Sequence, residues 1–305
     1  MQEASRRAVL AALLANLGIA VAKFAAFALT GATALLAEAI HSVADSGNEA
    51  LLALGGRRSR REPTAEHPFG YARERYFYAF VVALVLFSLG SLFAIYEGVD
   101  RLAHPSDVGS PVVGFAVLGF AFVLESLSLR TATRAARGQR GDASWWRFIR
   151  TTKAPELPVV LLEDFAGLVG LLLAALGLTL TVATGDPAYD AAASVAIGAL
   201  LGVIAALLAV ETQSLLIGEA ASPADQAAIR AAIVTSPDID RLIHLRTQHL
   251  GPEDLLVAAK IDLAPRADRD TARAIDRVEA RIRARVPHAR VIYLEPDEYR
   301  RRDGT

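Results

Sequence analysis

Six long apolar runs, separated by short polar stretches, fill the first part of the chain. Each run holds about 20 mainly apolar residues, the length that a helix needs to cross the hydrocarbon core of a bilayer. The pattern predicts six transmembrane helices, and the first is followed too closely by the second to be a cleaved signal peptide. The runs cover residues 8–29, 32–54, 76–99, 111–129, 157–183 and 188–210.

After the sixth run, the pattern changes at Gly218. Ser222-Pro223 is typical of a helix start with proline at the first helical position, and an amphipathic stretch follows to Ser236. The order α-β-β-α-β predicts a small α+β, ferredoxin-like domain with its helices on one face of the sheet. Its two strands, charged helix and last strand cover residues 239–249, 254–263, 268–286 and 289–295.

The pattern therefore divides the chain into two domains. Residues 1–217 are predicted to form a membrane all-α domain, a six-helix transmembrane bundle, and residues 218–305 a cytoplasmic α+β domain. A domain as small as the second gains stability by pairing with another copy, so we expect it to serve dimerisation.

Ionisable residues interrupt the second apolar run at helical spacing. His41 and Asp45 are four residues apart, which places an imidazole and a carboxylate on one helical face, about 6 Å apart along the axis. Each ionisable group at membrane depth costs roughly 2.5–3.5 kcal/mol, so such groups are rarely kept without a function. Glu38 and Asn48 lie on the same face.

The fifth run adds the adjacent acidic residues Glu163 and Asp164. Successive residues of a helix point about 100° apart, so both cannot face one site unless the helix is distorted. We expect Asp164 to be the ligand and Glu163 to act beside it or at the entrance. Glu125 in the fourth run has two interpretations, because it could join the ion path or pair with Lys23 of the first run.

These polar residues could form a structural network between helices, or they could bind a cation. The chain has no cysteine, so a metal site would have to use His, Asp or Glu. Imidazole and carboxylate together suit Zn²⁺, and the carboxylates would neutralise a dication in hydrocarbon. The same groups also bind protons, which predicts an exchanger of metal against protons.

The loop charges predict the orientation of the bundle. Arginine and lysine residues gather before the first run and in residues 57–75 and 130–153, whereas the opposite side holds Arg101. Positive charge marks the cytoplasmic side, so both termini are predicted to be cytoplasmic. Arginine far outnumbers lysine, which we interpret as GC-rich codon usage and therefore as a sign of a bacterial source. For a bacterial membrane protein we expect the plasma membrane as its location. The net charge of -1 gives no sign of nucleic-acid binding.

Two motifs carry a resemblance to a known family. HSVAD at residues 41–45 and HPFGY at residues 67–71, together with the six spans and the α-β-β-α-β tail, resemble the cation diffusion facilitator (cation efflux) family. The resemblance implies that His41 and Asp45 bind the transported metal together with residues of the fifth span. VLLED at 160–164 and TGDPAYD at 184–190 resemble the branch that includes the animal mitochondrial zinc exporter.

One ligand position departs from the family pattern. Val160 stands where the family usually places His or Asp, whereas Asp164 matches the second member of the fifth-span pair. The resemblance therefore implies a site whose missing ligand comes from Glu163, Glu125, Asn48 or water.

Two accessory metal sites of the family lack some of their usual histidine ligands in this sequence. Tyr71 stands where a second histidine would join His67 in the loop after the second span. Family members are usually homodimers joined partly through the tail, and the resemblance implies the same here. In the tail, the approximate positions of the family's metal-binding histidines hold Ile243, Ala259 and Tyr293, although Glu295 remains. The histidines that are present, His244, His249 and His288, are interpreted as ordinary surface or sheet residues.

The sequence therefore predicts a homodimeric divalent-cation transporter that exports a metal ion, most of all Zn²⁺, in exchange for protons. Metal and protons are its substrates, and no cofactor is expected. Two alternatives remain open: efflux of Mn²⁺, Fe²⁺ or Co²⁺ on the same fold, and a metal-responsive membrane protein that does not transport. An enzyme is not expected, because the sequence contains neither an HExxH helix nor a pattern for a base-activated nucleophile.

Overall fold

The computed structural model describes residues 2–31, 33–105, 110–265 and 270–299. The chain forms two compact units: Met1–Ser59 with Glu74–Gln213, and Arg60–Arg73 with Ser214–Thr305. The loop of residues 60–73 differs from the predicted boundary, because it belongs to the second unit rather than to the membrane part. There Ala72 packs directly against Gly251 of the tail.

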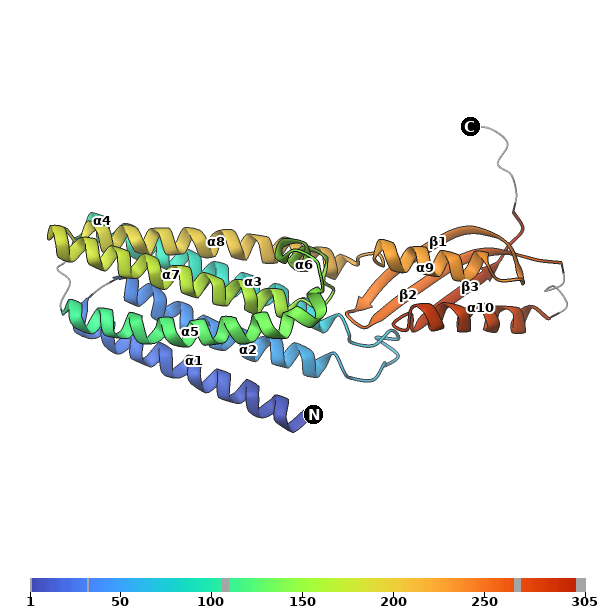
Figure 1. Cartoon of the computed structure of the whole chain (residues 1–305), viewed down its shortest axis with the longest axis horizontal. Coiled ribbons are helices and arrows are strands. Elements are labelled where there is room, and N and C mark those ends of the chain that lie inside the picture. Colours follow the sequence, from blue (N-terminus) through green and yellow to red (C-terminus); the bar gives the residue numbers. More distant parts are fainter. Residues whose placement is uncertain (1, 32, 106–109, 266–269, 300–305) are drawn as a thin grey trace, which may run out of the picture. The chain divides into compact units, whose positions relative to one another are not determined.

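The first unit is built of helices (Figure 1). Three of its elements, α3, the π-helical stretch η1 and α4, follow one another without a break. A π-helical turn is a rare irregularity in a long helix, and the predicted span 76–99 contains this one. The elements are α1 (Gln2–Thr30), α2 (Thr33–Arg58), α3 (Glu74–Val85), η1 (Leu86–Leu92), α4 (Phe93–Ala103), α5 (Pro111–Arg140), α6 (Trp145–Thr151), α7 (Glu156–Thr184) and α8 (Ala188–Ile217).

Four helices in the described residues are long and apolar enough to cross a membrane: Glu74–Ala103, α5, α7 and α8. In α1 the described apolar helix is shorter, Asn16–Thr30. Helix α2 is not among the four because polar residues such as Glu38, Asp45 and Glu49 lower its mean hydropathy. The prediction of six spans is thus confirmed for four, and the other two remain part of the proposal below.

The ends of the long helices follow from local sequence. Pro111 begins α5 directly after Ser110, at the position where its missing N–H is not needed. Helix α7 ends at Gly185, whose φ of 75° is in the left-handed region and whose N–H donates to the carbonyl oxygen of Thr181 at 2.8 Å. A glycine adopts that conformation without strain, so α7 stops cleanly before α8 begins.

Small residues allow α4 and α8 to approach closely. A Cβ atom on Gly98 would lie 2.8 Å from the carbonyl oxygen of Ala191, and one on Gly198 would lie 2.8 Å from the backbone nitrogen of Ile95. Any larger side chain at either glycine would push the two helices apart. Close backbone packing of this kind is characteristic of helix pairs in membranes.

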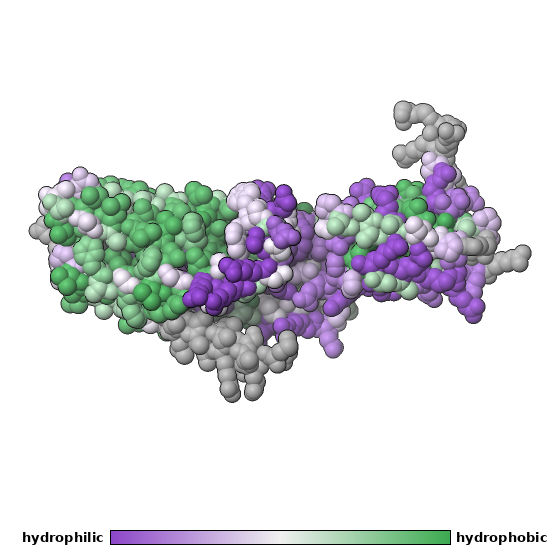
Figure 2. Space-filling model, viewed as in Figure 1, coloured by the Kyte–Doolittle hydropathy of each residue, from purple (hydrophilic) through white to green (hydrophobic). Residues whose placement is uncertain are grey.

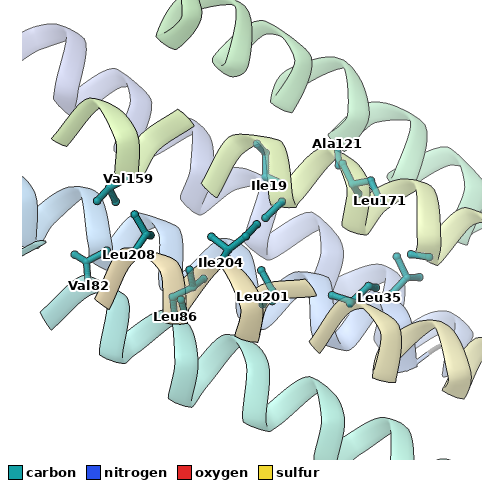
Figure 3. Packing of buried hydrophobic residues seen from close by; sticks show 14 of the residues in the cluster. Ile19, Leu35, Val82, Leu86, Ala121, Val159, Leu171, Leu201, Ile204 and Leu208 are labelled. Carbon is teal, nitrogen blue, oxygen red and sulfur yellow. The ribbon is translucent and has the colours of Figure 1, made fainter. Parts of the chain in front are cut away.

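Apolar side chains fill the centre of the helical unit and also cover its outside. Figure 2 shows hydrophobic residues over most of the visible surface of the long helices, and Phe120, Leu172 and Val203 are among the exposed ones. A surface of this kind suits lipid rather than water. The buried cluster draws on α1, α2, α3, η1, α5, α7 and α8 (Figure 3) and includes Ile19, Leu35, Val82, Leu86, Ala121, Val159, Leu171, Leu201, Ile204 and Leu208.

The second unit holds a three-stranded sheet and two helices, in the predicted order α-β-β-α-β. Strand β1 pairs antiparallel with β2, and β2 pairs parallel with β3, so β2 is central. The predicted start of α9 is confirmed, because the Asp225 N–H donates to the Ser222 Oγ at 3.1 Å. The elements are α9 (Pro223–Val234), β1 (Ile239–Gly251), β2 (Asp254–Leu263), α10 (Thr271–Arg285) and β3 (Val291–Pro296).

One hydrophobic core joins the sheet to both helices. Alternate residues of β2 point into it, and Ile229 of α9 and Val278 of α10 pack against the same face. This alternation is the period-2 pattern of a strand with one buried face. The inward residues of β2 are Leu255, Val257, Ala259 and Ile261. The predicted charged helix was placed from Asp268, and that position lies outside the described residues.

Candidate metal site

His41 and Asp45 lie on one face of α2, as their spacing predicts. The Nδ1 atom of His41 is 3.4 Å from Oδ1 of Asp45, and the His41 side chain is only 1% exposed. Neither ring nitrogen of His41 forms a hydrogen bond in the described part of the chain. Buried polar atoms normally have partners, so this imidazole has the capacity to accept a ligand such as a metal ion or a proton.

Glu163 and Asp164 face different helices. Asn48 of α2 donates its Nδ2–H to Oε1 of Glu163 at 2.6 Å, and Ser128 of α5 donates its hydroxyl to Oδ2 of Asp164 at 3.0 Å. The divergence agrees with the angle of about 100° between neighbouring residues of a helix. Glu163 therefore lies against the helix that carries His41. The expectation that Asp164 is the ligand stays a prediction.

Negative charge gathers around Asp45. The carboxylates of Glu163, Glu125 and Asp164 are near enough to repel that of Asp45, and the ammonium of Lys23 attracts it. Carboxylates held together in an apolar surrounding are destabilised unless a cation or protons neutralise them. The surroundings of Asp45 are therefore suited to hold positive charge.

Two glycines of α7 make room for carboxylates of other helices. A Cβ atom on Gly167 would lie 3.3 Å from the Glu125 carboxylate carbon, and one on Gly170 would lie 3.3 Å from that of Glu38 and even nearer its Oε1. Gly167 and Gly170 follow Glu163 at helical spacing, so all three lie along one face of α7. These glycines were not among the predicted site residues, although their spacing from Glu163 is a signal in the sequence that indicates them.

The polar residues of α1 have definite partners on α2. Lys23 forms an ion pair with Glu38, with Nζ 3.0 Å from Oε2, and not the ion pair with Glu125 that the sequence left open as one alternative. Asn16 donates its Nδ2–H to Oε1 of Glu49 at 3.0 Å, a contact that the sequence analysis did not predict. Helix α1 thus contributes polar partners to the same helix that carries the His41–Asp45 pair.

The predicted ligands are gathered on neighbouring helices but do not meet at one point. Among the residues that the structure describes, no group of three or more His, Asp or Glu side chains is close enough to hold a metal ion. His41 and Asp45 form a pair, while Glu163 and Asp164 are engaged by an amide and a hydroxyl. A complete site would require the carboxylates of α7 to exchange those partners for the metal.

A family model for the cation efflux transmembrane domain matches residues 9–217. The chain belongs to the cation efflux family. The resemblance seen in the sequence is therefore confirmed. This cation efflux protein is an integral membrane protein, which accounts for the apolar outer surface of its long helices.

Proteins of animals, plants and bacteria are similar to this chain in sequence. The mitochondrial proton-coupled zinc antiporter of Homo sapiens is 30% identical over 242 residues, which are 79% of this chain and 43% of that protein. Metal tolerance protein C4 of Arabidopsis thaliana is 34% identical over 262 residues, 85% of this chain and 57% of the relative. The chain thus spans about half the length of these two relatives. The zinc transporter ZitB of Escherichia coli is 35% identical over 92 residues, 30% of this chain and 29% of the relative.

The loop of residues 60–73 has hydrogen-bond and ring contacts among its own residues. The rings of His67 and Tyr71 lie 4.6 Å apart, and the hydroxyl groups of Thr64 and Tyr71 are 3.2 Å apart, within hydrogen-bonding distance. The Thr64 hydroxyl also accepts a hydrogen bond from the His67 N–H at 3.2 Å. Tyr71 therefore joins a network of hydroxyl and ring contacts at the position where a second metal ligand was considered.

The histidines of the tail take different positions. His244 is exposed on β1, whereas His249 is 3% exposed and its Nδ1 lies 3.3 Å from the carbonyl oxygen of Gly251. The ring of His288 lies 6.2 Å from that of His249, and its Nε2 is 3.5 Å from Oδ2 of Asp225. These positions fit the interpretation of surface and sheet residues.

Proposed function

We propose that this cation efflux protein exports a divalent cation, most of all Zn²⁺, from the cytoplasm in exchange for protons. The observation that carries the proposal is the buried His41–Asp45 pair, whose imidazole nitrogens lack hydrogen bonds in the described residues. Imidazole with carboxylate is a ligand set that Zn²⁺ accepts. The relatives support the choice of metal, since one is named a proton-coupled zinc antiporter and another a zinc transporter.

The charge balance of the helical unit supports a cation substrate. Lys23 neutralises Glu38, whereas five other carboxylates along α2, α5 and α7 have no lysine or arginine partner in the described ion pairs. Either a dication or protons can neutralise these carboxylates, so metal and protons compete for the same groups. That competition is the chemical basis of exchange. These other carboxylates are Asp45, Glu49, Glu125, Glu163 and Asp164.

The proposed cycle uses these residues in turn. Facing the cytoplasm, deprotonated His41 and Asp45 capture the metal, and Asp164 or Glu163 leaves its hydrogen-bond partner to join them. The bundle then changes the side to which the site opens, as in alternating access. Protons return to the imidazole and carboxylates on the far side, where they displace the metal, because a protonated ligand cannot coordinate.

Pairs at the predicted cytoplasmic ends of the helices fit this cycle. Arg75 at the start of α3 forms two hydrogen bonds with Glu156 at the start of α7, one of them at 2.9 Å. Arg150 of α6 lies 2.8 Å from Glu211 of α8. Charge-assisted contacts of this kind hold helix ends together and must be broken or moved when the inner side opens.

The architecture is part of the same proposal. We infer six membrane spans, with α1 and α2 completing the four apolar helices, and both termini on the cytoplasmic side where the arginines gather. A homodimer joined partly through the tail fits the small size of that unit. A bacterial plasma membrane is proposed from the arginine-rich composition of the chain.

A second candidate keeps the fold and changes the ion to Mn²⁺, Fe²⁺ or Co²⁺. The imidazole of His41 speaks against Mn²⁺, which prefers oxygen ligands. A third candidate, a metal-responsive protein without transport, is motivated by Val160, which lies among apolar side chains of α5 and α6 rather than at a polar site.

Metal flux into sealed vesicles tests the proposal. The purified protein is reconstituted, and uptake of Zn²⁺, Mn²⁺, Fe²⁺ and Co²⁺ is measured with and without an opposing proton gradient. We expect Zn²⁺ to be transported fastest, and the gradient to accelerate it. Absence of flux for every metal would leave only the non-transporting alternative, and flux that ignores the gradient would remove proton exchange from the proposal.

The chain offers a matched control for the site itself. Asp100 and His104 form a pair with the same four-residue spacing, 3.3 Å between Nδ1 and Oδ1, but their side chains are 47% and 79% exposed. We expect Asp45→Ala to abolish zinc flux and Asp100→Ala to leave it unchanged. Equal flux in the two variants would mean that the His41–Asp45 pair is not the transport site.

A further inference from the structure

The ammonium group of Lys23 lies in a cluster of oxygen atoms on α2, which we call the oxygen cage. Its Nζ is 3.0 Å from Oε2 of Glu38, 3.4 Å from the carbonyl oxygen of Glu38 and 2.7 Å from Oγ of Ser42. A carboxylate, a carbonyl and a hydroxyl are also the groups that bind free cations in proteins. The cage is therefore a cation site whose occupant is tethered to α1.

The cage is sealed inside the helical unit. Lys23 and Glu38 are both 0% exposed, and Ser42 is 2% exposed. The second carboxylate oxygen of Glu38, Oε1, is buried and has no hydrogen-bond partner in the described residues. Gly170 of α7 closes the cage on that side, because it leaves no room for a methyl group beside Oε1. A buried carboxylate with a spare oxygen depends strongly on the cation beside it.

The cage is next to the proposed transport site. Glu38 precedes His41 by three residues, so the two lie about one helical turn apart on α2. The charge of Lys23 acts on His41, on Asp45 and on Glu125. A cation in the cage thus influences both proposed metal ligands on α2 and one carboxylate on α5.

We propose that Lys23 is a tethered cation: its ammonium permanently occupies the oxygen cage of Glu38 and Ser42, in place of a free ion, beside the site that exchanges metal. Because the tether prevents its release, the cage stays neutral when the transported metal leaves. The positive charge also repels a dication at His41 and Asp45, which favours release. This role in transport rests on the proposed function, whereas occupancy of the cage does not.

Replacing Lys23 by methionine tests the occupancy. Methionine keeps the apolar stem but is one atom shorter than lysine and carries no charge, so it empties the position of Nζ. We expect the full-length Lys23→Met protein in detergent to regain thermal stability as ammonium chloride is added at constant ionic strength, in a saturable manner. Wild type should not respond, because its cage is already filled.

Two controls make the result specific to the cage. Lys260 also contacts two carboxylate oxygens, of Glu295 and Asp297, each at 3.0 Å, but on the surface. We expect Lys260→Met to show no saturable response to ammonium. In the double variant Lys23→Met/Glu38→Gln the cage carries no net charge, so its stability should no longer depend on ammonium.

The outcomes separate the cage from the transport role. A saturable rise in the midpoint of Lys23→Met that disappears in the double variant supports the tethered cation, whether or not the protein transports zinc. No response, or failure of Lys23→Met to fold at every ammonium concentration, would overturn it. In vesicles we further expect zinc flux of Lys23→Met to fall and to recover with ammonium; recovery of stability without recovery of flux would contradict the transport role alone.

Discussion

Two of the six histidines are buried, one in each unit, and they use their ring nitrogens differently. His249 in the tail is 3% exposed, and its Nδ1 lies within reach of the Gly251 carbonyl at the turn of its own hairpin. His41 in α2 is 1% exposed and has no hydrogen-bond partner in the described residues. Burial alone therefore does not mark a site. A buried polar group without a partner does, because its desolvation is not offset by the fold.

The ion pairs of the two units show the same difference. In the tail, Arg277 donates to both carboxylate oxygens of Asp238, at 2.8 and 2.9 Å, and the hydrogen bonds raise the pKa of Arg277. In the helical unit, Lys23 reaches one carboxylate oxygen of Glu38 and leaves the other without a partner. Both carboxylate oxygens of Asp238 thus have a partner, whereas the Glu38 carboxylate depends on Lys23 through one oxygen alone.

The largest expected effect comes from exchanging each histidine for alanine. His41→Ala removes a proposed ligand whose ring nitrogens form no hydrogen bond with the described residues, so we expect zinc flux in vesicles to be abolished while the protein stays folded. His249→Ala removes a buried side chain and its hydrogen bond, so we expect the free energy of unfolding of the tail to fall by about 1–3 kcal/mol. Flux per folded molecule should be unchanged in that variant.

Measurements of flux and of thermal midpoint on both variants test this contrast. The assignment of a transport role to His41 and a structural role to His249 would be wrong if His41→Ala lost stability and kept its flux. It would be equally wrong if His249→Ala lost flux at a temperature where it is fully folded.

A smaller effect is expected from filling the space beside Glu38. Gly170→Ala places a methyl group against the Glu38 carboxylate, so we expect a loss of stability of about 1–3 kcal/mol from overpacking, together with slower zinc flux. Gly119→Ala on α5 is the control, because nothing lies within 4 Å of a Cβ atom there. Removal of glycine from an open helical position should stabilise by about 0.5–1 kcal/mol. Equal midpoints for the two variants would show that the Glu38 carboxylate does not need Gly170.

Much of this fold follows from the pattern of the sequence. The apolar runs mark the long helices, and the alternation of Leu255, Val257 and Ala259 marks a strand with one buried face. The four-residue spacing of His41 and Asp45 is enough to place them together. These features depend on neighbours along the chain, where helical and strand geometry is fixed.

The features that the sequence did not reveal depend on contacts between distant segments. The partner of Lys23 proved to be Glu38, because α1 packs along α2, and no spacing rule connects residues of separate helices. The assignment of residues 60–73 to the second unit has the same origin, in the contact between Ala72 and Gly251. The span predicted for α2 was not confirmed, because the polar side chains that contact other helices interrupt its apolar pattern.

A substitution at Val160 adds a further candidate metal ligand to the helical unit. It lies one turn before Asp164 on the same face of α7, so Val160→His places an imidazole beside that carboxylate. We expect Zn²⁺ to bind more tightly, by about tenfold, and with a steeper pH dependence, since one more group must lose its proton before the metal binds. Titration of zinc binding at several pH values measures both, and unchanged affinity and slope would mean that position 160 does not face the metal.

The smallest effect is expected in the tail, where the comparison predicts no response to zinc at all. A fragment of residues 222–305 begins at the Ser222 cap and keeps the core around Ile229, Val257 and Val278. We expect it to fold and to self-associate without added metal, because the described residues contain no cluster of three metal ligands, and no buried side-chain nitrogen or oxygen of the described tail lacks a hydrogen-bond partner. Circular dichroism and sedimentation check the fold and the association, and calorimetry with zinc should show no stoichiometric binding at submicromolar affinity. Stoichiometric binding would contradict the comparison, and its loss in a His288→Ala fragment would place the metal beside His249 and Asp225.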